Sequence, residues 1–419
     1  MHVAVVGGGL AGLVAARHLA EAGAEVELLE ERDRVGGRVR TRVVDGFTLD
    51  RGFQVFFSAY PAARRELEYD DLDLRGFAPG ATIARPNHRS TLADPFGDPS
   101  AALPTLLNRD VRTADKLRLF RLQRELKRRD GDELLDSDTT IREYLEGYGF
   151  SAAFVERFAE PFYGGITLDR SLGTSSGVFE YTFRMLSTGK TVVPAEGMGA
   201  IPEQLRRQAE NVGAKIETKT AVTGLKIDDG CVTVETDDGD RSADCVVVAT
   251  DPKTAGELTG VETPTGSKAC VTVHFSLPEH QALDTGSRII LNAETDRPNT
   301  VAPMSAAAPE YAPEGKQLLS ATFLGERDES DEELGAVVEG AMRSWYPENH
   351  FGEFEVVGVD RVEFAQFPQP PGFRESLPDI DEPDGPVVLA GDYTRWSSIQ
   401  GALESGKRAA DAIIDEGLS

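Results

Sequence analysis

The strongest constraint on this chain lies in its first thirty residues. A β-branched run, a glycine turn, a helical stretch and a second apolar run follow one another there. The turn places Gly7, Gly9 and Gly12 in the spacing G-x-G-x-x-G, and Glu30 ends the second predicted strand. The glycines permit the tight turn, the approach of a diphosphate and close helix–strand packing, while the acid accepts hydrogen bonds from a ribose. The helix N-terminus stabilises phosphate charge. The sequence therefore predicts a Rossmann-like dinucleotide-binding domain.

Two later segments are predicted to return to this domain. Residues 195–252 are typical of a helix (201–212), a strand "KIETKT", a hairpin (222–236) and a buried strand "DCVVVAT". Near the end, "PVVLAGD" predicts a buried strand, and the next residues predict a helix with a capping box of Ser397 and Gln400. Because 419 residues are too many for one core, we expect two domains in an α/β fold. The cofactor domain is discontinuous (1–85, 190–262 and 384–419), and an inserted α+β substrate domain is helical over 86–189 and mostly β over 263–383.

The composition bears on the partners, the cellular compartment and the membrane association that we expect for this chain. The net charge of −27 argues against a nucleic-acid partner. It fits either an ordinary soluble acidic enzyme or, as the favoured interpretation, an enzyme adapted to a salt-rich cytoplasm. Cys231, Cys245 and Cys270 form no metal-binding spacing and leave one cysteine unpaired, which fits a reducing cytoplasm. No window of 18 residues is free of charge and turn residues, so we expect no transmembrane helix.

A second glycine pair distinguishes between cofactors. The run "LEERDRVGGRVRT" brings Gly36, Gly37 and Arg38 after the second strand, where a simple nicotinamide dehydrogenase needs no further phosphate-facing loop. This run resembles the flavin-containing amine oxidase superfamily, which includes monoamine oxidases, protoporphyrinogen oxidase and the plant and cyanobacterial type of phytoene and carotene desaturases. The resemblance implies FAD as cofactor. The covalent flavin thioether of monoamine oxidases is excluded, since no cysteine lies near the C-terminus, so we expect FAD to be bound non-covalently.

The resemblance also implies a set of cofactor-binding residues. Gly37 and Arg38 are expected beside the diphosphate, the Val222 backbone beside the adenine, and Asp392 on the ribityl chain. The N–H groups at the start of the last helix are expected to face the flavin pyrimidine edge, where the helix dipole favours negative charge. The full set is Gly7, Gly9, Ala11, Gly12, Glu30, Gly37, Arg38, Gly52, Phe53, Gln54, Val222, Gly391, Asp392, Ser398, Ile399 and Gln400.

Two further stretches bear on the substrate. The segment "DRGFQVFFSAYPAARREL" (50–67) resembles plant-type phytoene desaturases, and its aromatic residues either line an apolar channel or belong to the core: Phe53, Phe56, Phe57 and Tyr60. The stretch 160–179 resembles protoporphyrinogen oxidase and the desaturases, and is expected to pack over the flavin cavity. We expect hydride transfer from a C–H bond of a hydrophobic, isoprenoid- or carotenoid-like substrate to flavin N5. The alternatives are an amine oxidase or a protoporphyrinogen-oxidase-like enzyme, and more remotely a non-enzymatic binding protein on the same scaffold.

The catalytic groups are less defined. The desaturases usually have Met-Glu where this chain has Ile399 and Gln400, which removes a carboxylate near the flavin edge. Lys268 is a candidate for the lysine that holds a water in amine oxidases, but its spacing to Pro278 is two residues off that pattern, which favours a structural role. No acid–base pair appears among the six histidines at a suitable spacing, and no metal site is expected.

Residues 101–130 form a basic segment in the acidic chain. Nine Lys or Arg residues face four acids, and Leu117, Phe120 and Leu122 lie among them. One interpretation is a solvated helix whose basic face pairs with acidic neighbours. The other is a docking helix on the inner face of the membrane, which would place a cytoplasmic protein at a bilayer. The sequence leaves the oligomeric state and the electron acceptor open.

Overall fold

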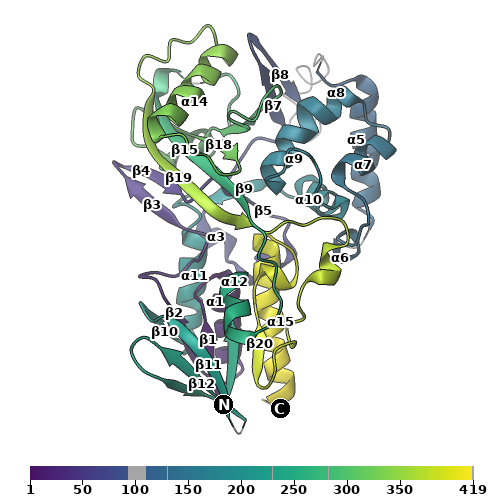
Figure 1. The fold of residues 1–419 in the computed structure, drawn as a ribbon. Helices are drawn as coiled ribbons and strands as arrows, with labels where there is room; N and C mark the ends of the chain where they lie inside the picture. The colour runs from purple at the N-terminus through teal and green to yellow at the C-terminus, as the bar shows by residue number, and fades with distance from the viewer. Residues whose placement is uncertain (93–109, 130, 229, 282, 418–419) are drawn as a thin grey trace.

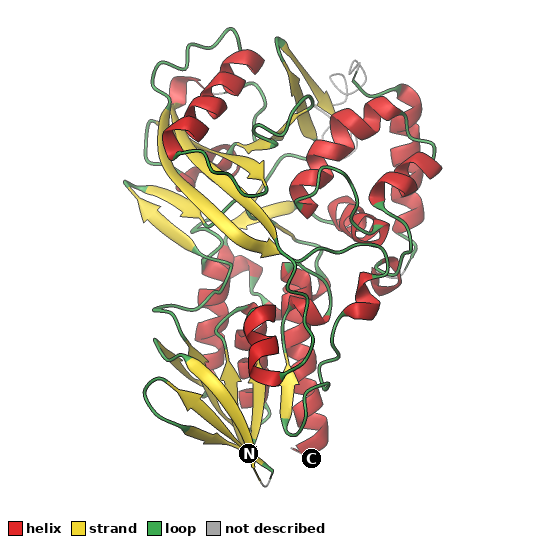
Figure 2. Ribbon diagram, in the orientation of Figure 1, coloured by secondary structure: helices red, strands yellow, loops and turns green. Residues whose placement is uncertain are grey.

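The computed structural model describes residues 1–92, 110–129, 131–228, 230–281 and 283–417. One part of the molecule carries both termini, and the other combines a large sheet with a cluster of helices (Figure 1). In the second part most helices gather on one side, and the strands lie on the other together with the helix labelled α14 (Asp331–Trp345) (Figures 1 and 2).

A five-stranded parallel sheet forms the part that carries the termini. Its strands come from all three segments assigned to the cofactor domain, in the order β10 (Lys215–Thr218), β2 (Glu25–Glu30), β1 (His2–Val6), β14 (Cys245–Val248) and β20 (Val387–Leu389). The continuous Val/Ala runs of β1 and β14 are buried, as central parallel strands require. Helix α1 (Leu10–Glu21) packs against α11 (Ala200–Asn211) and α15 (Ile399–Gly417). The predicted α/β fold with a Rossmann-like part is confirmed.

A seven-stranded sheet dominates the other part. Its order is β19 (Glu355–Gln366), β15 (Lys268–Pro278), β18 (Lys316–Leu324), β17 (Thr300–Ala302), β16 (Ile289–Asn292), β7 (Ala81–Arg85) and β8 (His88–Leu92). Strand β7 falls within the predicted cofactor segment 1–85, but it pairs in parallel with β16 and so joins this second sheet. The sequence offered no signal for the pairing of β7 with β16, because β16 lies some two hundred residues further along the chain.

The alternation along β15 explains how this sheet is covered. Val271, Val273, Phe275 and Leu277 are buried in one core cluster with residues of α14 (Asp331–Trp345). The alternate positions are Cys270, Thr272, His274 and Ser276. Since successive side chains of a strand point to opposite faces, these smaller and more polar residues lie on the other face of the sheet. Cys270 lines the large cavity described below.

The helical cluster is built from short helices, and two of them begin with a side-chain cap. It contains α5 (Thr113–Leu126), α7 (Ile141–Gly147), a π-helical turn (Val155–Ala159), α9 (Glu160–Thr167) and α10 (Ser176–Thr188). A capping box of Thr140 and Glu143 begins α7, and the Ser175 side chain caps α10. These caps stabilise the ends of helices that are too short to be stable alone.

Candidate functional site

A large cavity of about 2070 Å³ is lined by residues of the parallel sheet, the second sheet and the helical cluster. Typical ligand pockets have roughly 300–1,000 Å³, so this cavity has room for a dinucleotide and a sizeable second molecule together. Of the predicted cofactor residues, all except Gly12 and Gln400 line it. Residues separated by most of the chain therefore meet in one space.

The glycine turn fits a diphosphate. A Cβ atom on Gly7 would lie 2.7 Å from the carbonyl oxygen of Ala249, and one on Gly12 would lie 2.0 Å from the carbonyl oxygen of Gly7. Both glycines are thus needed for close packing. The Cβ position of Gly12 faces the backbone of Gly7 and the side chain of Ala249, and Gly12 does not line the cavity. A Cβ on Gly9 would meet nothing within 4 Å. Gly9 precedes α1 and makes no side-chain cap, so the first turn of the helix presents its N–H groups beside an open space.

The Glu30 carboxylate is fixed by backbone donors. Gly8 N–H donates to Oε2 at 2.7 Å, and Arg32 N–H donates to Oε1 at 3.0 Å. The side chain is buried but lines the cavity. A carboxylate oxygen accepts more than one hydrogen bond, so both oxygens can still accept from ribose hydroxyls.

We expect Glu30→Gln to weaken FAD binding by about one to two decades. The lost charge-assisted bonds to ribose are worth roughly 1.5–3 kcal/mol, and the amide leaves one of the two backbone donors without an acceptor. Titration of the apoprotein with FAD measures the effect. Glu25→Gln, at the exposed start of the same strand, is the control. An unchanged dissociation constant in Glu30→Gln would show that Glu30 does not face the ribose.

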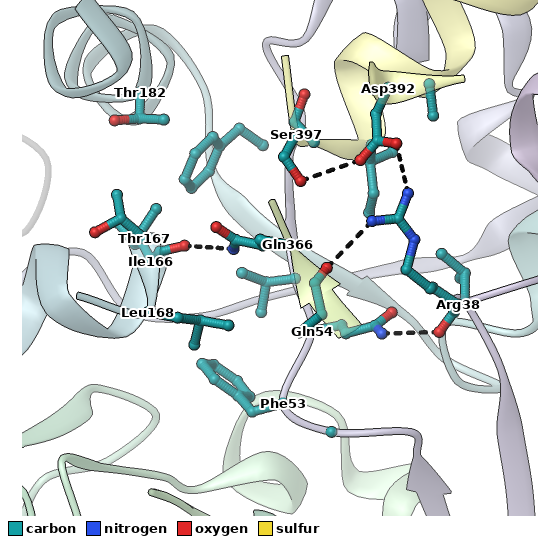
Figure 3. A pocket seen from close by; sticks show the side chains of 18 of the residues that line it. Arg38, Phe53, Gln54, Ile166, Thr167, Leu168, Thr182, Gln366, Asp392 and Ser397 are labelled. Atoms are coloured by element: carbon teal, nitrogen blue, oxygen red, sulfur yellow. Dashed lines mark hydrogen bonds and ion pairs between the residues drawn. The ribbon is translucent and has the colours of Figure 1, made fainter. Parts of the chain in front are cut away.

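An ion pair joins the second glycine loop to the end of the last strand (Figure 3). Arg38 donates to Asp392 Oδ1 at 2.6 Å and to the carbonyl oxygen of Ala365 at 3.2 Å, and Gln54 Nε2 donates to the carbonyl oxygen of Arg38 at 3.0 Å. Burial lowers the pKa of Arg38, but the neighbouring Asp392 outweighs it, so the pKa is raised and the guanidinium stays charged. Because Gly36 and Gly37 have φ values of +118° and +57°, the loop can turn tightly enough to place Arg38 here.

The capping box predicted for the last helix is wrong. The helix begins at Ile399, and Ser398 caps it by accepting a hydrogen bond from Gly401 N–H at 2.8 Å. Ser397 Oγ instead donates to Asp392 Oδ2 at 3.1 Å, and Gln400 Oε1 accepts from Ala62 N–H at 2.9 Å. The pattern Ser-Ser-x-Gln offered two serines, and the carboxylate of Asp392 binds the first. Ser398 and Ile399 line the cavity, and their expected contacts with the flavin stay a prediction.

The remainder of the cavity is mostly apolar. Phe53, Phe57 and Tyr60 line it, whereas Phe56 is buried in the core against Tyr69. The helical cluster adds aliphatic and aromatic side chains, among them Phe158, Phe162, Ile166, Leu168, Val178, Phe183 and Leu186. Trp396, Gln366 and Gln369 also line the cavity, and sequence reasoning missed them. Gln366, the last residue of β19, donates from Nε2 to the Ile166 carbonyl oxygen in α9 at 2.8 Å (Figure 3). Gln369 Oε1 accepts from Ser397 N–H at 2.9 Å, so it joins the stretch after β19 to the residues before α15.

Lys268 does not belong to the described lining of the cavity. Its ammonium donates to the Thr167 carbonyl, to Asp169 Oδ2 and to Thr174 Oγ1 at 3.2–3.3 Å. Burial lowers its pKa. This arrangement ties the connection between α9 and α10 to β15, which is a structural role.

Two kinds of site are not found in the described part of the chain. No group of three His, Cys, Asp or Glu residues there is arranged to hold a metal ion. None of the helices that the structure describes is both long enough and apolar enough to cross a membrane. His274 is buried between Ser320 Oγ (2.9 Å) and Asp360 Oδ2 (3.0 Å) and is not among the lining residues.

Comparison with known proteins agrees with this geometry. The model of the flavin containing amine oxidoreductase family matches residues 10–414. The chain belongs to this family. FAD is the cofactor of this family, and the cavity described above combines a dinucleotide cradle with an apolar chamber.

Individual relatives differ in the molecules they are named for. Phytoene dehydrogenase from Streptomyces griseus is 29% identical over 325 residues, 71% of this chain and 61% of that protein. Coproporphyrinogen III oxidase from Propionibacterium freudenreichii subsp. freudenreichii is 34% identical over 172 residues, 39% of this chain and 31% of that protein. The matches thus span less than two thirds of these relatives' own length. Cyclohexylamine oxidase from Brevibacterium oxydans IH-35A superposes with a TM-score of 0.70 at 18% identity, covering 99% of both chains, which shows a shared fold alone.

Proposed function

We propose that this oxidoreductase takes a hydride from a C–H bond of a hydrophobic, isoprenoid- or carotenoid-like substrate. The observation that carries the proposal is the wall of the cavity formed by α5, the π-helical turn, α9 and α10. Its described lining consists of aliphatic, aromatic and a few neutral polar side chains, with Lys116 as its one charged residue. Burial of an extended apolar molecule against such a wall is favourable at roughly 25 cal/mol per Å².

An amine substrate fits this wall poorly. A protonated amine removed from water needs an opposite charge or several acceptors. The carboxylates that line the cavity are Glu30, Glu31, Asp251, Glu363 and Asp392. They come from the Rossmann-like part and from β19, and two of them already belong to the predicted cofactor site. The described helical wall contributes no carboxylate.

The residues of this chain have three tasks in the proposed reaction. When bound, FAD supplies the hydride acceptor at N5. The glycine turn, Glu30 and the Arg38–Asp392 pair hold the cofactor. The aromatic side chains of the cavity exclude water and hold the substrate chain, so that the C–H bond faces the flavin. We assign no general base among the described residues.

A second candidate rests on one observation. Lys116 of α5 and Lys190, which follows α10, line the cavity, and cations at these places suit a substrate that carries carboxylates, as porphyrinogens do. The match to coproporphyrinogen III oxidase adds to this candidate.

Anaerobic mixing with three substrate classes separates these functions. The oxidised protein is mixed with a C40 polyene in detergent micelles, with a panel of primary amines and polyamines, or with porphyrinogens, and bleaching of the flavin band is followed. We expect the polyene to bleach the flavin and the amines to leave it oxidised. Bleaching by amines alone would overturn the proposal, and bleaching by porphyrinogens alone would establish the second candidate.

The surface of α5 supports a second part of the proposal, contact with an anionic membrane. Leu117 and Phe120 are 67% and 44% exposed, and both also line the cavity. An apolar pair at the cavity mouth would let a lipid-soluble substrate pass from the bilayer into the chamber. Several basic residues already have acidic partners, namely Arg118 with Asp115, Arg121 with Glu125 and Arg129 with Glu180. Residues 101–109 and 130 of the basic segment lie outside the described residues.

We expect the wild type to float with anionic liposomes at low salt, and the double variant Leu117→Ser, Phe120→Ser to remain unbound. Changing Arg121, Arg124, Arg128 and Arg129 to Gln should weaken flotation at low salt, because each basic residue near an anionic surface contributes about 1 kcal/mol. Molar salt screens this contribution. Ile227→Ser, at an exposed apolar residue of β11 (Val222–Asp228), is the matched control. If the wild type fails to float at either salt concentration, the membrane contact is wrong.

A further inference from the structure

A glutamine side chain links the predicted cofactor end of the cavity to its helical wall. Gln369 is 3% exposed and lines the cavity. Its Oε1 accepts a hydrogen bond from Ser397 N–H at 2.9 Å, and its carbonyl oxygen accepts one from Ser175 N–H at 2.8 Å. Ser397 in turn donates to Asp392, and the Ser175 side chain caps α10. Gln369 therefore holds a fixed position between the residues before α15 and the helices of the apolar chamber.

The orientation of the Gln369 amide leaves its NH2 group free. A backbone N–H can only donate, so the amide oxygen must face Ser397 and Nε2 must point away from it. Nε2 makes no hydrogen bond within the described structure, and it is not one of the described polar atoms that are sealed from open space without a partner. Because the residue is buried from the outside and lines the cavity, the open space beside Nε2 is the cavity.

The neighbouring polar side chains at this end of the cavity already have partners. Asp392 accepts from Arg38 and from Ser397, and Ser398 Oγ caps α15. The Gln369 NH2 group therefore adds a neutral donor beside the start of α15, where the helix N–H groups are expected to face the flavin pyrimidine ring. Since polar groups in a binding cavity nearly always have a partner, this donor indicates an acceptor on the bound molecule.

We infer that the Gln369 amide donates a hydrogen bond to the pyrimidine ring of the bound flavin and raises its reduction potential. This ring offers carbonyl oxygens and a ring nitrogen as acceptors, and it carries the negative charge that reduction adds. A hydrogen bond to a charged acceptor is stronger than one to a neutral acceptor, so the donor stabilises reduced FAD more than oxidised FAD. The contact involves the cofactor alone and does not depend on the proposed substrate.

The two-electron reduction potential of bound FAD, measured against a reference dye at alkaline pH, tests this contact. Gln369→Glu keeps an oxygen atom for Ser397 N–H, but it removes the NH2 donor and adds a negative charge. Gln369→Met removes both hydrogen bonds and adds no charge. In each variant we expect the dissociation constant of reduced FAD to rise at least about tenfold more than that of oxidised FAD, which lowers the potential by about 30 mV. The decrease should be larger in Gln369→Glu.

Gln208→Glu is the matched control. Gln208 lies in α11, outside the described lining of the cavity, and its Oε1 accepts from Arg17 at 2.8 Å. The control thus makes the same change of charge and keeps an acceptor, and we expect it to leave the potential unchanged. An equal decrease in Gln208→Glu and Gln369→Glu would show that the net charge alone sets the potential, and would overturn the assignment to Gln369.

A merely structural role of Gln369 gives a different result. If the side chain only positions Ser397, Gln369→Glu should keep the wild-type potential, because it keeps the acceptor, and that result would overturn the inference. Should Gln369→Glu fail to fold, the infrared carbonyl bands of oxidised FAD decide, since a hydrogen-bonded carbonyl absorbs at lower frequency. We expect lower frequencies in the wild type than in Gln369→Met, and equal frequencies would likewise overturn the inference. Because the dye replaces the substrate, failure of the proposed function leaves these outcomes unaffected.

Discussion

Gly12→Ala is expected to abolish FAD binding and to lower the free energy of unfolding by about 3 kcal/mol. The added Cβ would lie 2.0 Å from the carbonyl oxygen of Gly7. The backbone of residue 12 and the backbone of Gly7 cannot move apart without separating α1 from β1. Overpacking of this kind costs roughly 1–3 kcal/mol or more. Separating the helix from the strand also moves the N–H groups that are expected to hold the diphosphate. Chemical denaturation and FAD titration of the same preparation measure the two effects.

Gly9→Ala separates cofactor binding from folding. Its backbone is extended (φ −74°, ψ −179°) and a Cβ there meets no atom within 4 Å, so the apoprotein should keep nearly wild-type stability. FAD affinity should still fall, because the methyl group projects into the space expected for the diphosphate. Gly340→Ala within α14, where a Cβ also meets nothing, should leave affinity unchanged and stabilise the helix by about 1 kcal/mol. Normal FAD affinity in Gly12→Ala would contradict the account of the turn.

Asp50→Ala is expected to destabilise the protein by about 3 kcal/mol. Asp50 is 2% exposed and accepts hydrogen bonds from Thr41 Oγ1, from Met198 N–H at 2.8 Å and from Tyr311 Oη at 2.8 Å. Removal of the carboxylate leaves three buried donors without an acceptor, each at about 1–3 kcal/mol with partial relaxation. Asp50 immediately precedes the stretch that carries Gly52, Phe53 and Gln54, so this loss should also raise the dissociation constant for FAD.

Asp50→Asn tests the same network through its pH dependence. Burial raises the pKa of Asp50 above its ordinary value of 3.8, despite the three donors that lower it. The neutral carboxyl therefore stabilises the fold fully below about pH 3.8, and this contribution is lost as the pH rises through the raised pKa of the folded state. The amide stays neutral at every pH, so the stability of Asp50→Asn relative to the wild type should increase over that interval. If the difference in free energy of unfolding between Asp50→Asn and the wild type does not change with pH, the pKa of Asp50 is the same in the folded and unfolded states, which would contradict this prediction.

The sequence predicted the parts of the site that depend on local backbone rules. A strand–glycine turn–helix frame follows from residue type and spacing, and Gly7, Gly9 and Gly12 occupy the expected turn. The three segments of the parallel sheet could be recognised because buried parallel strands are continuous apolar runs. The aromatic stretch after Asp50 could be placed near the cavity but not residue by residue, since Phe56 and Phe57 differ only in which face of a two-residue strand they occupy.

The remaining parts depend on contacts between distant segments. The pairing of β7 with β16, the pairing of Arg38 with Asp392 and the choice of Ser398 over Ser397 as helix cap are decided by tertiary partners.

The absorption spectrum of the purified protein, taken before and after acid precipitation, tests the central claim most directly. We expect flavin bands in the native protein and a yellow supernatant with one FAD per chain after precipitation, because the predicted cofactor contacts are backbone, carboxylate and guanidinium groups and include no covalent bond. A solvent extract of the same sample should contain any polyene that co-purifies. A colourless protein that takes up no FAD at high salt, or flavin that stays with the precipitate after solvent extraction, would contradict the account.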